Sequence, residues 1–486
     1  MTNKQYETVI GLEVHIELST KTKIFCGCST KFGALPNTQT CPVCTGMPGS
    51  LPVLNQKVVE SAIALGLATG SRIGRRCLFD RKNYFYPDNP QNYQISQLYV
   101  PICQDGYLRI EAKDNTGKNS DGKTEKNIRI HEMHMEEDAG KLIHEEATGV
   151  SLVDYNRSGV PLIEIVSEPD MGSAEEVIAY LEKLRMVCKY LGISDCKLQE
   201  GSMRVDVNLS VREAGCKTPG TRTEMKNLNS FKAITRAIET ERKRQIALLS
   251  DGKKVVQETR RWDDNKGESY PMRSKEDAKD YRYFPEPDLP PVLISEEWIA
   301  EIKSRQPELR EEKAARFRKE YGLSEYDAKL LTQSRALAEL YEETAGLSLQ
   351  PKKTANWFLG ELLRLLKESG KEAEELTVTP KHMADLICAV EEGKINQANA
   401  KVVFAEIVAD DVEPLSYMEQ HGLSMLSDDG ALQAAIEEVL AENESVVEEY
   451  RAGKEKVFGF LVGQVMKKTK GKADPGKVSE CLRGRL

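Results

Sequence analysis

The chain has 486 residues, of which 40% are hydrophobic, so it is long enough to form two to four domains that each bury a core. Its longest apolar runs fall far below the roughly 18 residues of a membrane span, and no segment resembles a signal peptide. Eleven cysteines without a secretory segment predict a protein of the reducing cytoplasm, and no membrane partner is expected. The net charge of −9 argues against a protein that coats nucleic acid without sequence preference.

The first predicted element is a strand over residues 10–18, where apolar and polar side chains alternate strictly. Its polar face carries Glu13, His15 and Glu17, two carboxylates flanking an imidazole and a set that can hold a divalent cation. The alternative for this strand alone is a single histidine with its ion-pair partners.

Further acids occur in similar settings along the chain. Glu164 lies inside the apolar run 162–166, where an unpaired charge would be costly. The alternating segments 204–211 and 222–226 and the predicted loop HMEEDAGK add polar rows. These rows contain Arg204, Asp206, Asn208, Ser210, Arg222, Glu224 and Lys226, and in the loop His134, Glu136, Glu137 and Asp138. We therefore predict a sheet with an acidic polar face beside basic residues, which suits chemistry on a phosphorylated substrate.

Four cysteines have the spacing of a zinc ribbon. Cys26 and Cys28 form one close pair, and Cys41 and Cys44 form a second pair twelve residues later. Two thiolate pairs on separate turns can close a tetrahedral site, and a site with four cysteine ligands leaves no open position for catalysis. The sequence therefore predicts a structural zinc site, with four ordinary thiols as the alternative.

Two other motifs are ambiguous. Residues 117–124 (GKNSDGKT) match the P-loop pattern, but both flanks look like strands, so we expect a hairpin tip without nucleotide. Residues 80–87 (DRKNYFYP) place cations among aromatics and could bind a nucleotide or RNA through stacking and charge, or form ordinary core packing. The candidate substrate-binding residues here are Arg81, Lys82, Tyr84 and Tyr86.

The chain then changes character. Helices are expected at 56–70, 173–191 and 228–249 among the strands, whereas the proline-rich segment 284–291 predicts a linker. Beyond it the pattern is helical, with helices expected at 328–343, 356–369, 380–392, 397–409 and 432–449 and helix starts at Ser295 and Thr379. We expect domains at 1–293, 294–408 and 409–486, and a Gly-rich segment at 425–430 could also separate two helical domains.

The last 36 residues are basic. They carry ten Lys/Arg against Glu455, Asp474 and Glu480. Lys467, Lys468, Lys470 and Lys472 follow an apolar helix and could contact an RNA backbone, although a solvated tail is an equal alternative.

The chain resembles a known family over essentially its whole length. The strings that carry the resemblance, in order, are VIGLEVHIEL, CPVC-x-GMPGSLPVLN, FDRKNYFYPD, YQISQ, HMEEDAGK, PLIEIVSEPD, EGSMRVDVN, EMKNLNS and DYRYFPEPDLPP. They resemble the B subunits of bacterial tRNA-dependent amidotransferases, which convert Glu-tRNA(Gln) or Asp-tRNA(Asn) to the amide. The resemblance implies an α+β fold, with an N-terminal cradle domain like glutamine synthetase and guanidino kinases, then a helical domain and a YqeY-like tail that grips tRNA.

The resemblance also implies residue roles and partners. ATP phosphorylates the side-chain carboxylate and ammonia then displaces phosphate, with Mg²⁺ as cofactor and a structural Zn²⁺. The residues implied to hold magnesium are Glu13, His15, Glu137, Glu164, Asp206 and Glu224, and Arg204, Arg222 and Lys226 are added as phosphate-stabilising candidates on spacing alone. The sequence shows no glutaminase pattern, so ammonia is expected from an amidase-type A subunit, with a small C subunit completing a heterotrimer.

Two other functions compete with this interpretation. A metal-dependent phosphohydrolase or nuclease could use the same acidic face, and it would hydrolyse RNA or nucleotide without ammonia. A non-catalytic zinc-ribbon scaffold that binds RNA would tolerate loss of Glu13 or Glu164. The clustering of acids on one face disfavours the scaffold, and the whole-chain resemblance disfavours both.

Overall fold

The strand β1 (Tyr6–Glu17) lies in the middle of a nine-stranded sheet and pairs antiparallel with β10 and β11 on its two sides. The computed structural model describes residues 5–113, 123–145, 147–274, 281–425, 429–469 and 472–486. In sheet order the strands are β14 (Glu268–Ser274), β13 (Glu258–Asp263), β12 (Thr223–Lys226), β11 (Met203–Glu213), β1, β10 (Pro161–Ser167), β7 (Lys123–Glu137), β6 (Cys103–Lys113) and β2 (Arg72–Ile73). All neighbours are antiparallel except β12 and β13.

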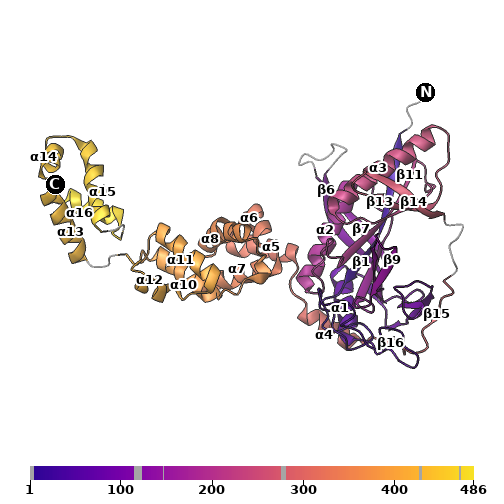
Figure 1. The fold of residues 1–486 in the computed structure, drawn as a ribbon. Helices are drawn as coiled ribbons and strands as arrows, with labels where there is room; N and C mark the ends of the chain where they lie inside the picture. The colour runs from indigo at the N-terminus through magenta and orange to yellow at the C-terminus, as the bar shows by residue number, and fades with distance from the viewer. Residues whose placement is uncertain (1–4, 114–122, 146, 275–280, 426–428, 470–471) are drawn as a thin grey trace. The chain divides into compact units, whose positions relative to one another are not determined.

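Three helices cover the apolar face of this sheet (Figure 1): α1 (Gln56–Ala68), α2 (Ala174–Leu191) and α3 (Phe231–Ser250). The helices α1 and α2 begin where the sequence predicted, whereas α3 begins at Phe231 and not at the predicted residue 228. Asn55, Ser173 and Ser230 set these starts, because their side-chain oxygens cap the first turns. The apolar residues of β1 are buried in the same core as side chains of these helices. The opposite face of β1, with Glu13 and His15, is thereby left to form the site.

The proline-rich segment is not a linker, contrary to the prediction. Its first two residues form β15 (Phe284–Pro285), which pairs with β4 (Asp80–Asn83), and the two residues that follow it form β16 (Val292–Leu293), which pairs with β3 (Arg76–Cys77). Pro285 is tolerated because β15 is a short strand at the edge of its sheet. The strand β5 (Tyr93–Ser96) completes the sheet of β4 and β15, and β8 (Lys141–Glu145) pairs with β9 (Val150–Asp154).

The first compact unit therefore extends past the predicted boundary at 293. It comprises Met1–Leu309, because α4 (Glu296–Arg305) packs Ile299 and Ile302 into the core of the sheet domain. Ser295 caps this helix as predicted, since its side chain accepts a hydrogen bond from the backbone of Trp298. No helix within the described residues is long and apolar enough to cross a membrane.

The second unit, Arg310–Leu486, is helical, as the sequence predicted. Its α-helices are α5 (Arg310–Tyr321), α6 (Glu325–Leu331), α7 (Arg335–Ser348), α8 (Pro351–Trp357), α9 (Leu363–Ser369), α10 (Pro380–Glu391), α11 (Gln397–Asp410), α12 (Pro414–Gln420), α13 (Asp429–Glu442), α14 (Glu444–Arg451), α15 (Phe458–Lys468) and α16 (Pro475–Arg483). Its described residues also contain short 3₁₀ turns at 373–375 and 455–457 and a π-helical turn at 358–362.

Three predicted helices are interrupted. Ser334 starts a new helix inside 328–343, the π-helical turn breaks 356–369, and Asn443 separates α13 from α14. Thr379 precedes α10 as predicted, but its hydroxyl binds Asp411 and makes no cap hydrogen bond. Met418 shares one core with Phe404, so the boundary predicted at 408/409 falls inside that core, and residues 432–482 contribute a separate one.

The core beneath the site should be sensitive to cavities. Ile163 on β10 is fully buried, whereas Ile143 on β8 is 39% exposed. We expect Ile163→Ala to lower the free energy of unfolding of the sheet domain by about 2–5 kcal/mol, because it leaves a cavity, and Ile143→Ala to stay within about 0.5 kcal/mol. Denaturant titration followed by tryptophan emission measures both. Equal losses in the two variants would contradict the assigned core.

Candidate functional site

The register of the sheet brings the predicted polar residues together on one face. On one side of β1, His15 pairs with Glu164 of β10, which in turn pairs with His134 of β7. On the other side, Glu13 pairs with Asp206 of β11, and β12 continues the row. The acidic face predicted from period-two alternation is therefore present, and it spans five neighbouring strands.

The acids form two groups on this face. The first cluster consists of His15, Glu136 and Glu164, and each residue offers one ligand atom within 4.8 Å of the others. The imidazole Nε2 of His15 lies 3.3 Å from Glu164 and 3.5 Å from Glu136. Two carboxylates and an imidazole nitrogen at this separation can hold one divalent cation.

The second cluster consists of Glu13, Asp206 and Glu224, also with ligand atoms within 4.8 Å of one another. Asn208 donates a 2.9 Å hydrogen bond to Glu13, and Lys226 lies 2.5 Å from Asp206 and 3.0 Å from Glu224. This cluster consists only of oxygen ligands, the set that Mg²⁺ prefers.

The crowding of carboxylates changes their protonation. Burial and the charge of Glu164, together with Glu224 and Asp206, raise the pKa of Glu13. Burial favours the neutral amine of Lys226, but the charges of Asp206 and Glu224 outweigh it and raise the pKa of Lys226. The face thus holds more negative charge than its own cations offset, and a divalent cation would relieve the repulsion.

His134 supports the first cluster from the side. It is buried, and its Nε2 lies 3.0 Å from Glu164. Burial opposes its protonation, but the nearby carboxylates of Glu132 and Glu164 raise its pKa to about 10. Burial disfavours the Glu164 carboxylate, but His134 and His15 outweigh that effect and lower the pKa of Glu164. His131, also near the motif, is exposed and pairs with Glu168 at 2.9 Å, so it lies outside the cluster.

The structure places Glu136, not the predicted Glu137, in the first cluster. The HMEE residues belong to β7 and not to a loop, so successive side chains point to opposite faces and Glu136 shares the face of His134. Glu137 instead accepts hydrogen bonds from the Gln91 side chain and from the backbone N–H of Ile95. If residues 134–137 had been predicted as a strand, the two-residue alternation would have placed Glu136, and not Glu137, on the same face as His134.

The predicted cations differ in position. Arg204, which pairs with His15 across β1 and β11, lies 2.9 Å from Asp138, and Asp138 also binds Arg157. Burial disfavours the Asp138 carboxylate, but its two arginine neighbours outweigh that effect and lower the pKa of Asp138 to about 2. Arg222 is exposed just before β12. Arg204 and Lys226 therefore flank the acids, whereas Arg222 lies at the edge.

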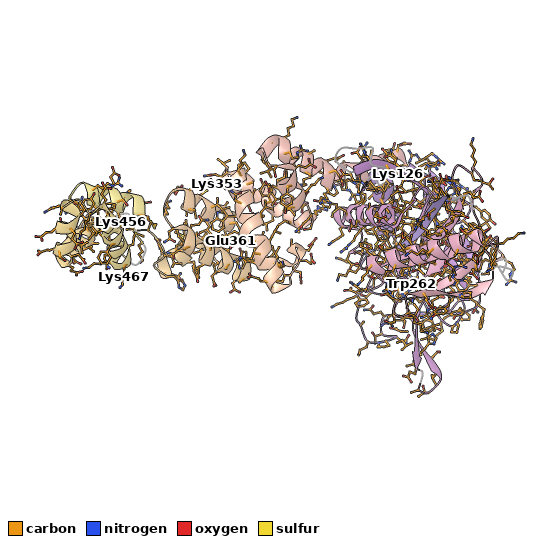
Figure 2. The ribbon with its side chains drawn as sticks, turned by 90° about the horizontal axis from the view of Figure 1, so that it is seen from above. Lys126, Trp262, Lys353, Glu361, Lys456 and Lys467 are labelled. Atoms are coloured by element: carbon orange, nitrogen blue, oxygen red, sulfur yellow. The ribbon has the colours of Figure 1, made fainter. Side chains whose placement is uncertain are left out.

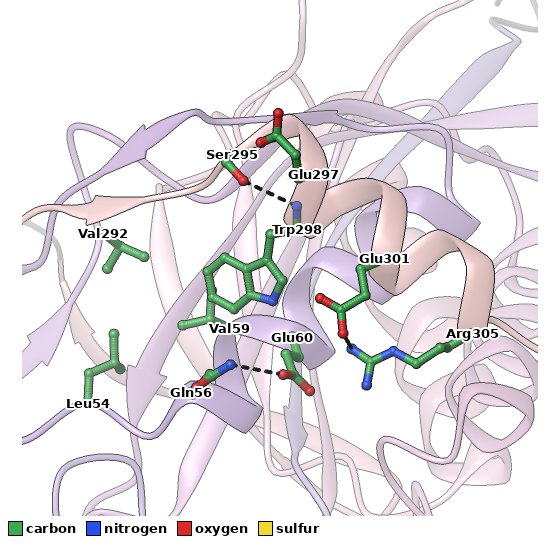
Figure 3. A pocket seen from close by; sticks show the side chains of 10 residues that line it. All are labelled: Leu54, Gln56, Val59, Glu60, Val292, Ser295, Glu297, Trp298, Glu301 and Arg305. Carbon is green, nitrogen blue, oxygen red and sulfur yellow. Dashed lines mark hydrogen bonds and ion pairs between the residues drawn. The ribbon is translucent and has the colours of Figure 1, made fainter.

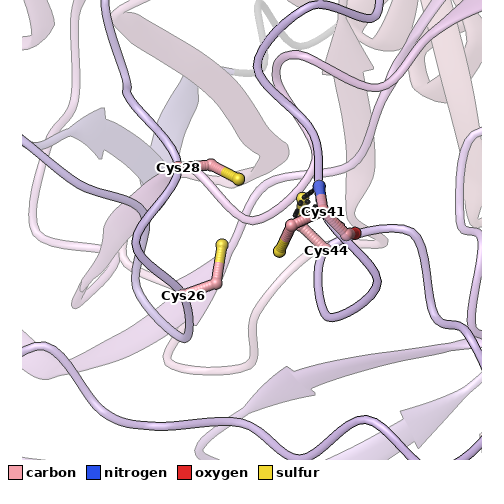
Figure 4. Close-up of side chains that lie close together, drawn as sticks. All are labelled: Cys26, Cys28, Cys41 and Cys44. Carbon is pink, nitrogen blue, oxygen red and sulfur yellow. Dashed lines mark hydrogen bonds between the residues drawn. The ribbon is translucent and has the colours of Figure 1, made fainter.

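The four predicted cysteines do converge (Figure 4). The sulfurs of Cys26, Cys28, Cys41 and Cys44 lie within 4.8 Å of one another. A hydrogen bond from Cys26, with further help from Lys23, lowers the pKa of Cys44 to about 4, and the Lys23 amine lies 3.4 Å from the Cys44 sulfur. All eleven cysteines are free thiols. Four sulfurs at this separation can therefore hold a metal ion in tetrahedral coordination.

The basic–aromatic segment is split by its contacts. Arg81 is bound to Glu286 at 2.6 Å and to Asp288 at 2.9 Å, so internal acids offset its charge. Lys82 lies 5.0 Å from the ring centre of Tyr281, and Tyr84 packs edge-on against the same ring. Tyr86 is 49% exposed. Burial raises the pKa of Glu136, and the charge of Lys82 is among those that oppose the rise, so Lys82 acts on the first cluster.

The remaining candidates lie elsewhere. The P-loop match falls mostly outside the described residues, but its flanks are the antiparallel strands β6 and β7, as predicted. In the tail, Lys467 is exposed (Figure 2), Lys468 is bound to Glu438 and Glu442, and Lys472 is half-buried, whereas Lys470 lies outside the described residues.

Comparison with known proteins agrees with these motifs. The model of the GatB/GatE catalytic domain matches residues 8–300, and that of the GatB domain matches residues 339–486. The chain is 62% identical to the B subunit of the aspartyl/glutamyl-tRNA(Asn/Gln) amidotransferase of Lachnospira eligens over 485 residues, 99% of both chains. The chain belongs to this family. The corresponding B subunit of Caldicellulosiruptor saccharolyticus is 53% identical, again over 99% of both chains.

The assignment of Glu136 rather than Glu137 to the first cluster can be tested by metal binding. Mn²⁺ titration followed by electron paramagnetic resonance should show that Glu136→Gln weakens at least one site by about tenfold or more, because it removes an anionic oxygen ligand. Glu137→Gln is the matched control and should bind Mn²⁺ like the unaltered chain. Weakened binding in Glu137→Gln with normal binding in Glu136→Gln would restore the residue predicted from the motif.

Proposed function

We propose that this chain is the subunit that activates the side-chain carboxylate of Glu-tRNA(Gln), Asp-tRNA(Asn) or both for amidation. The observation that carries the proposal is the pair of carboxylate clusters on one sheet face, with Lys226 and Arg204 beside them. The names of the relatives, which specify both amino acids and both tRNAs, support this substrate class.

The chemistry explains why such a face is useful. A carboxylate resists attack by ammonia because oxide cannot leave. Transfer of the γ-phosphoryl group of ATP to a carboxylate oxygen gives an acyl phosphate and ADP. Ammonia then attacks the acyl carbon, and phosphate leaves with that oxygen while a proton is lost from nitrogen. Each partner in the phosphoryl transfer is anionic, so the site has to tolerate crowded negative charge.

The donor atoms fit magnesium in both clusters. Carboxylate oxygens dominate, one imidazole joins the first cluster, and the raised pKa of Glu13 indicates charge that a cation would neutralise. When bound, Mg²⁺ screens the phosphates and stabilises charge on the transferring phosphoryl group. The chain's own part is to hold the carboxylates in place through Asn208 and His134 and to present Lys226 to phosphate oxygens.

Several finer assignments belong to the same proposal. The sheet domain would be the cradle domain of the resemblance, and the four cysteines would hold a structural Zn²⁺. The helical domain and the basic tail would contact tRNA through Lys467 and its neighbours. Ammonia would come from an amidase-type A subunit, with a small C subunit, so the isolated chain should have negligible activity with glutamine. Since tRNA is its substrate, we place the complex in the cytoplasm.

The two alternatives are separable from this proposal. A phosphohydrolase or nuclease would release product from RNA or nucleotide without ammonia, and a scaffold would tolerate loss of the carboxylates. A scaffold does not explain why His134 and Glu136 are buried together on the sheet, because it would bear the cost of charge burial without benefit. A phosphohydrolase or nuclease could use the same face, and the names of the relatives disfavour it.

The decisive variant is Glu13→Gln in the reconstituted complex. With ammonium chloride replacing glutamine, we expect amide formation and tRNA-dependent ADP release to fall on the order of 100-fold, because one anionic ligand of the second cluster is lost. Glu7→Gln is the control on the same strand, since Glu7 pairs with Arg212 at 3.1 Å away from the clusters. Full activity of Glu13→Gln would move the chemistry elsewhere.

The cysteine site makes a separate prediction. Metal analysis of the purified chain should find one zinc per chain, and Cys41→Ser should lose it because three thiolates no longer close the site. Cys216→Ser alters an exposed thiol outside the cluster and should keep it. A chain that folds without zinc, or a Cys41→Ser variant that retains it, would contradict the assignment.

A further inference from the structure

Lys23 is a buried cation beside the four cysteines. Its side chain is fully buried, and it precedes Cys26 in the chain. Within the part of the chain that the structure describes, its amine donates two hydrogen bonds, to the Cys44 sulfur at 3.4 Å and to the carbonyl of Tyr155 at 3.1 Å, and forms no ion pair with a carboxylate. The roles proposed above leave this lysine unexplained.

Other cations of the chain contact acids. Lys313, which is also buried, contacts Glu342 at 2.7 Å. Even at the surface between α1 and α4, Arg305 contacts Glu301 at 3.3 Å (Figure 3). An ammonium group that is taken out of water is costly unless an anion lies beside it. Lys23 therefore needs an anion among its own contacts.

The Cys44 sulfur can supply that negative charge. Of the two acceptors that Lys23 contacts, the sulfur alone can carry a full charge, because the other is a backbone carbonyl. Metal ligation deprotonates cysteine, and four thiolates carry more negative charge than one Zn²⁺ neutralises. An ammonium group at hydrogen-bond distance from one of the sulfurs offsets part of this excess. Four neutral thiols would instead leave the ammonium group without a counter-charge.

The backbone around Lys23 fixes the position of its amine. The Lys23 N–H donates a 2.9 Å hydrogen bond to the Cys28 carbonyl, so the lysine belongs to the turn of the first cysteine pair while its amine reaches the second pair. From the other side, the Ser158 hydroxyl donates a 3.0 Å hydrogen bond to the Cys44 carbonyl. The backbone of Gly159 packs against both side chains, since a Cβ there would lie 3.5 Å from the Lys23 Cδ and from the Cys44 Cβ. Both cysteine turns thus build the contact and shield it from water.

We propose that Lys23 is the fixed counter-charge of the four-cysteine metal site and donates a hydrogen bond to a metal-bound sulfur, that of Cys44. It is a positioning residue and not a metal ligand, because an ammonium group has no lone pair to donate. Its charge stabilises the thiolates and strengthens metal binding. The inference rests on the proposed function, which supplies the zinc.

Cobalt reports directly on this contact. Chains produced with Co²⁺ in place of Zn²⁺ should show the visible bands of tetrahedral thiolate coordination and a sulfur-to-cobalt charge-transfer band. In Lys23→Met we expect the charge-transfer band at lower energy, because a thiolate without its N–H donor gives up an electron more easily. A chelator should also remove Co²⁺ from this variant at a concentration lower by about tenfold, the typical effect of losing a hydrogen-bond partner of a metal ligand.

Two further variants separate the charge of Lys23 from its shape. Lys21→Met removes an exposed lysine from the same segment and should leave both the band and the metal affinity unchanged. Lys23→Arg keeps a cation with N–H donors and should hold Co²⁺ more tightly than Lys23→Met. If Lys23 served only to tie Tyr155 to the cysteine turn, Lys23→Met would lower the free energy of unfolding without moving the band.

The outcomes are distinct. An unchanged band and affinity in Lys23→Met would overturn the inference and leave the zinc assignment in place. Lys23→Arg that is no better than Lys23→Met, or failure of both variants to fold, would overturn it as well, since the position would then require the shape of lysine and not its charge. If only Lys23→Met fails to fold, a normal band in Lys23→Arg supports the inference. An unaltered chain that binds no metal would refute the zinc assignment, and this inference with it.

Discussion

The arrangement depends on one constraint, the alternation of β1 at the centre of a twisted antiparallel sheet. Its apolar side chains are buried against three helices, and that burial fixes the register with both neighbouring strands. A slip of one residue would turn Glu13 and His15 into the core. The free energy of core packing therefore holds carboxylates closer together than they would lie in solution.

This constraint has a cost that points to function. Burial and repulsion by neighbouring carboxylates raise the pKa of Glu13 and of Glu136. The fold therefore makes ionisation of these two side chains less favourable than it is in water. Histidines and Lys226 offset part of the charge by direct contact. Charge crowding of this kind opposes folding, and its presence on the central strands is consistent with the proposed binding of cations and phosphates.

Much of this was predictable from sequence because period-two patterns report which side chains share a face. The alternation over 10–18 and 204–211 placed Glu13, His15 and Asp206 together, and the cysteine spacing placed four sulfurs together. Prediction failed where local pattern was absent or misleading. With HMEE predicted as a loop, the two-residue alternation could not choose between Glu136 and Glu137. The proline-rich segment begins with one edge strand and is followed by another, and the partners of both lie some 200 residues away in the chain. Long-range pairing of that kind leaves no local signal in the sequence.

In the proposed reaction, the side-chain carboxylate of the aminoacyl-tRNA is phosphorylated before ammonia attacks it. Glu-tRNA(Gln) labelled with ¹⁸O in the side-chain carboxylate tests this directly when it is amidated by the reconstituted complex with ATP. If the carboxylate is phosphorylated first, each phosphate released carries one ¹⁸O from the substrate, detected as an isotope shift in the ³¹P spectrum. Amide formation with unlabelled phosphate would contradict it.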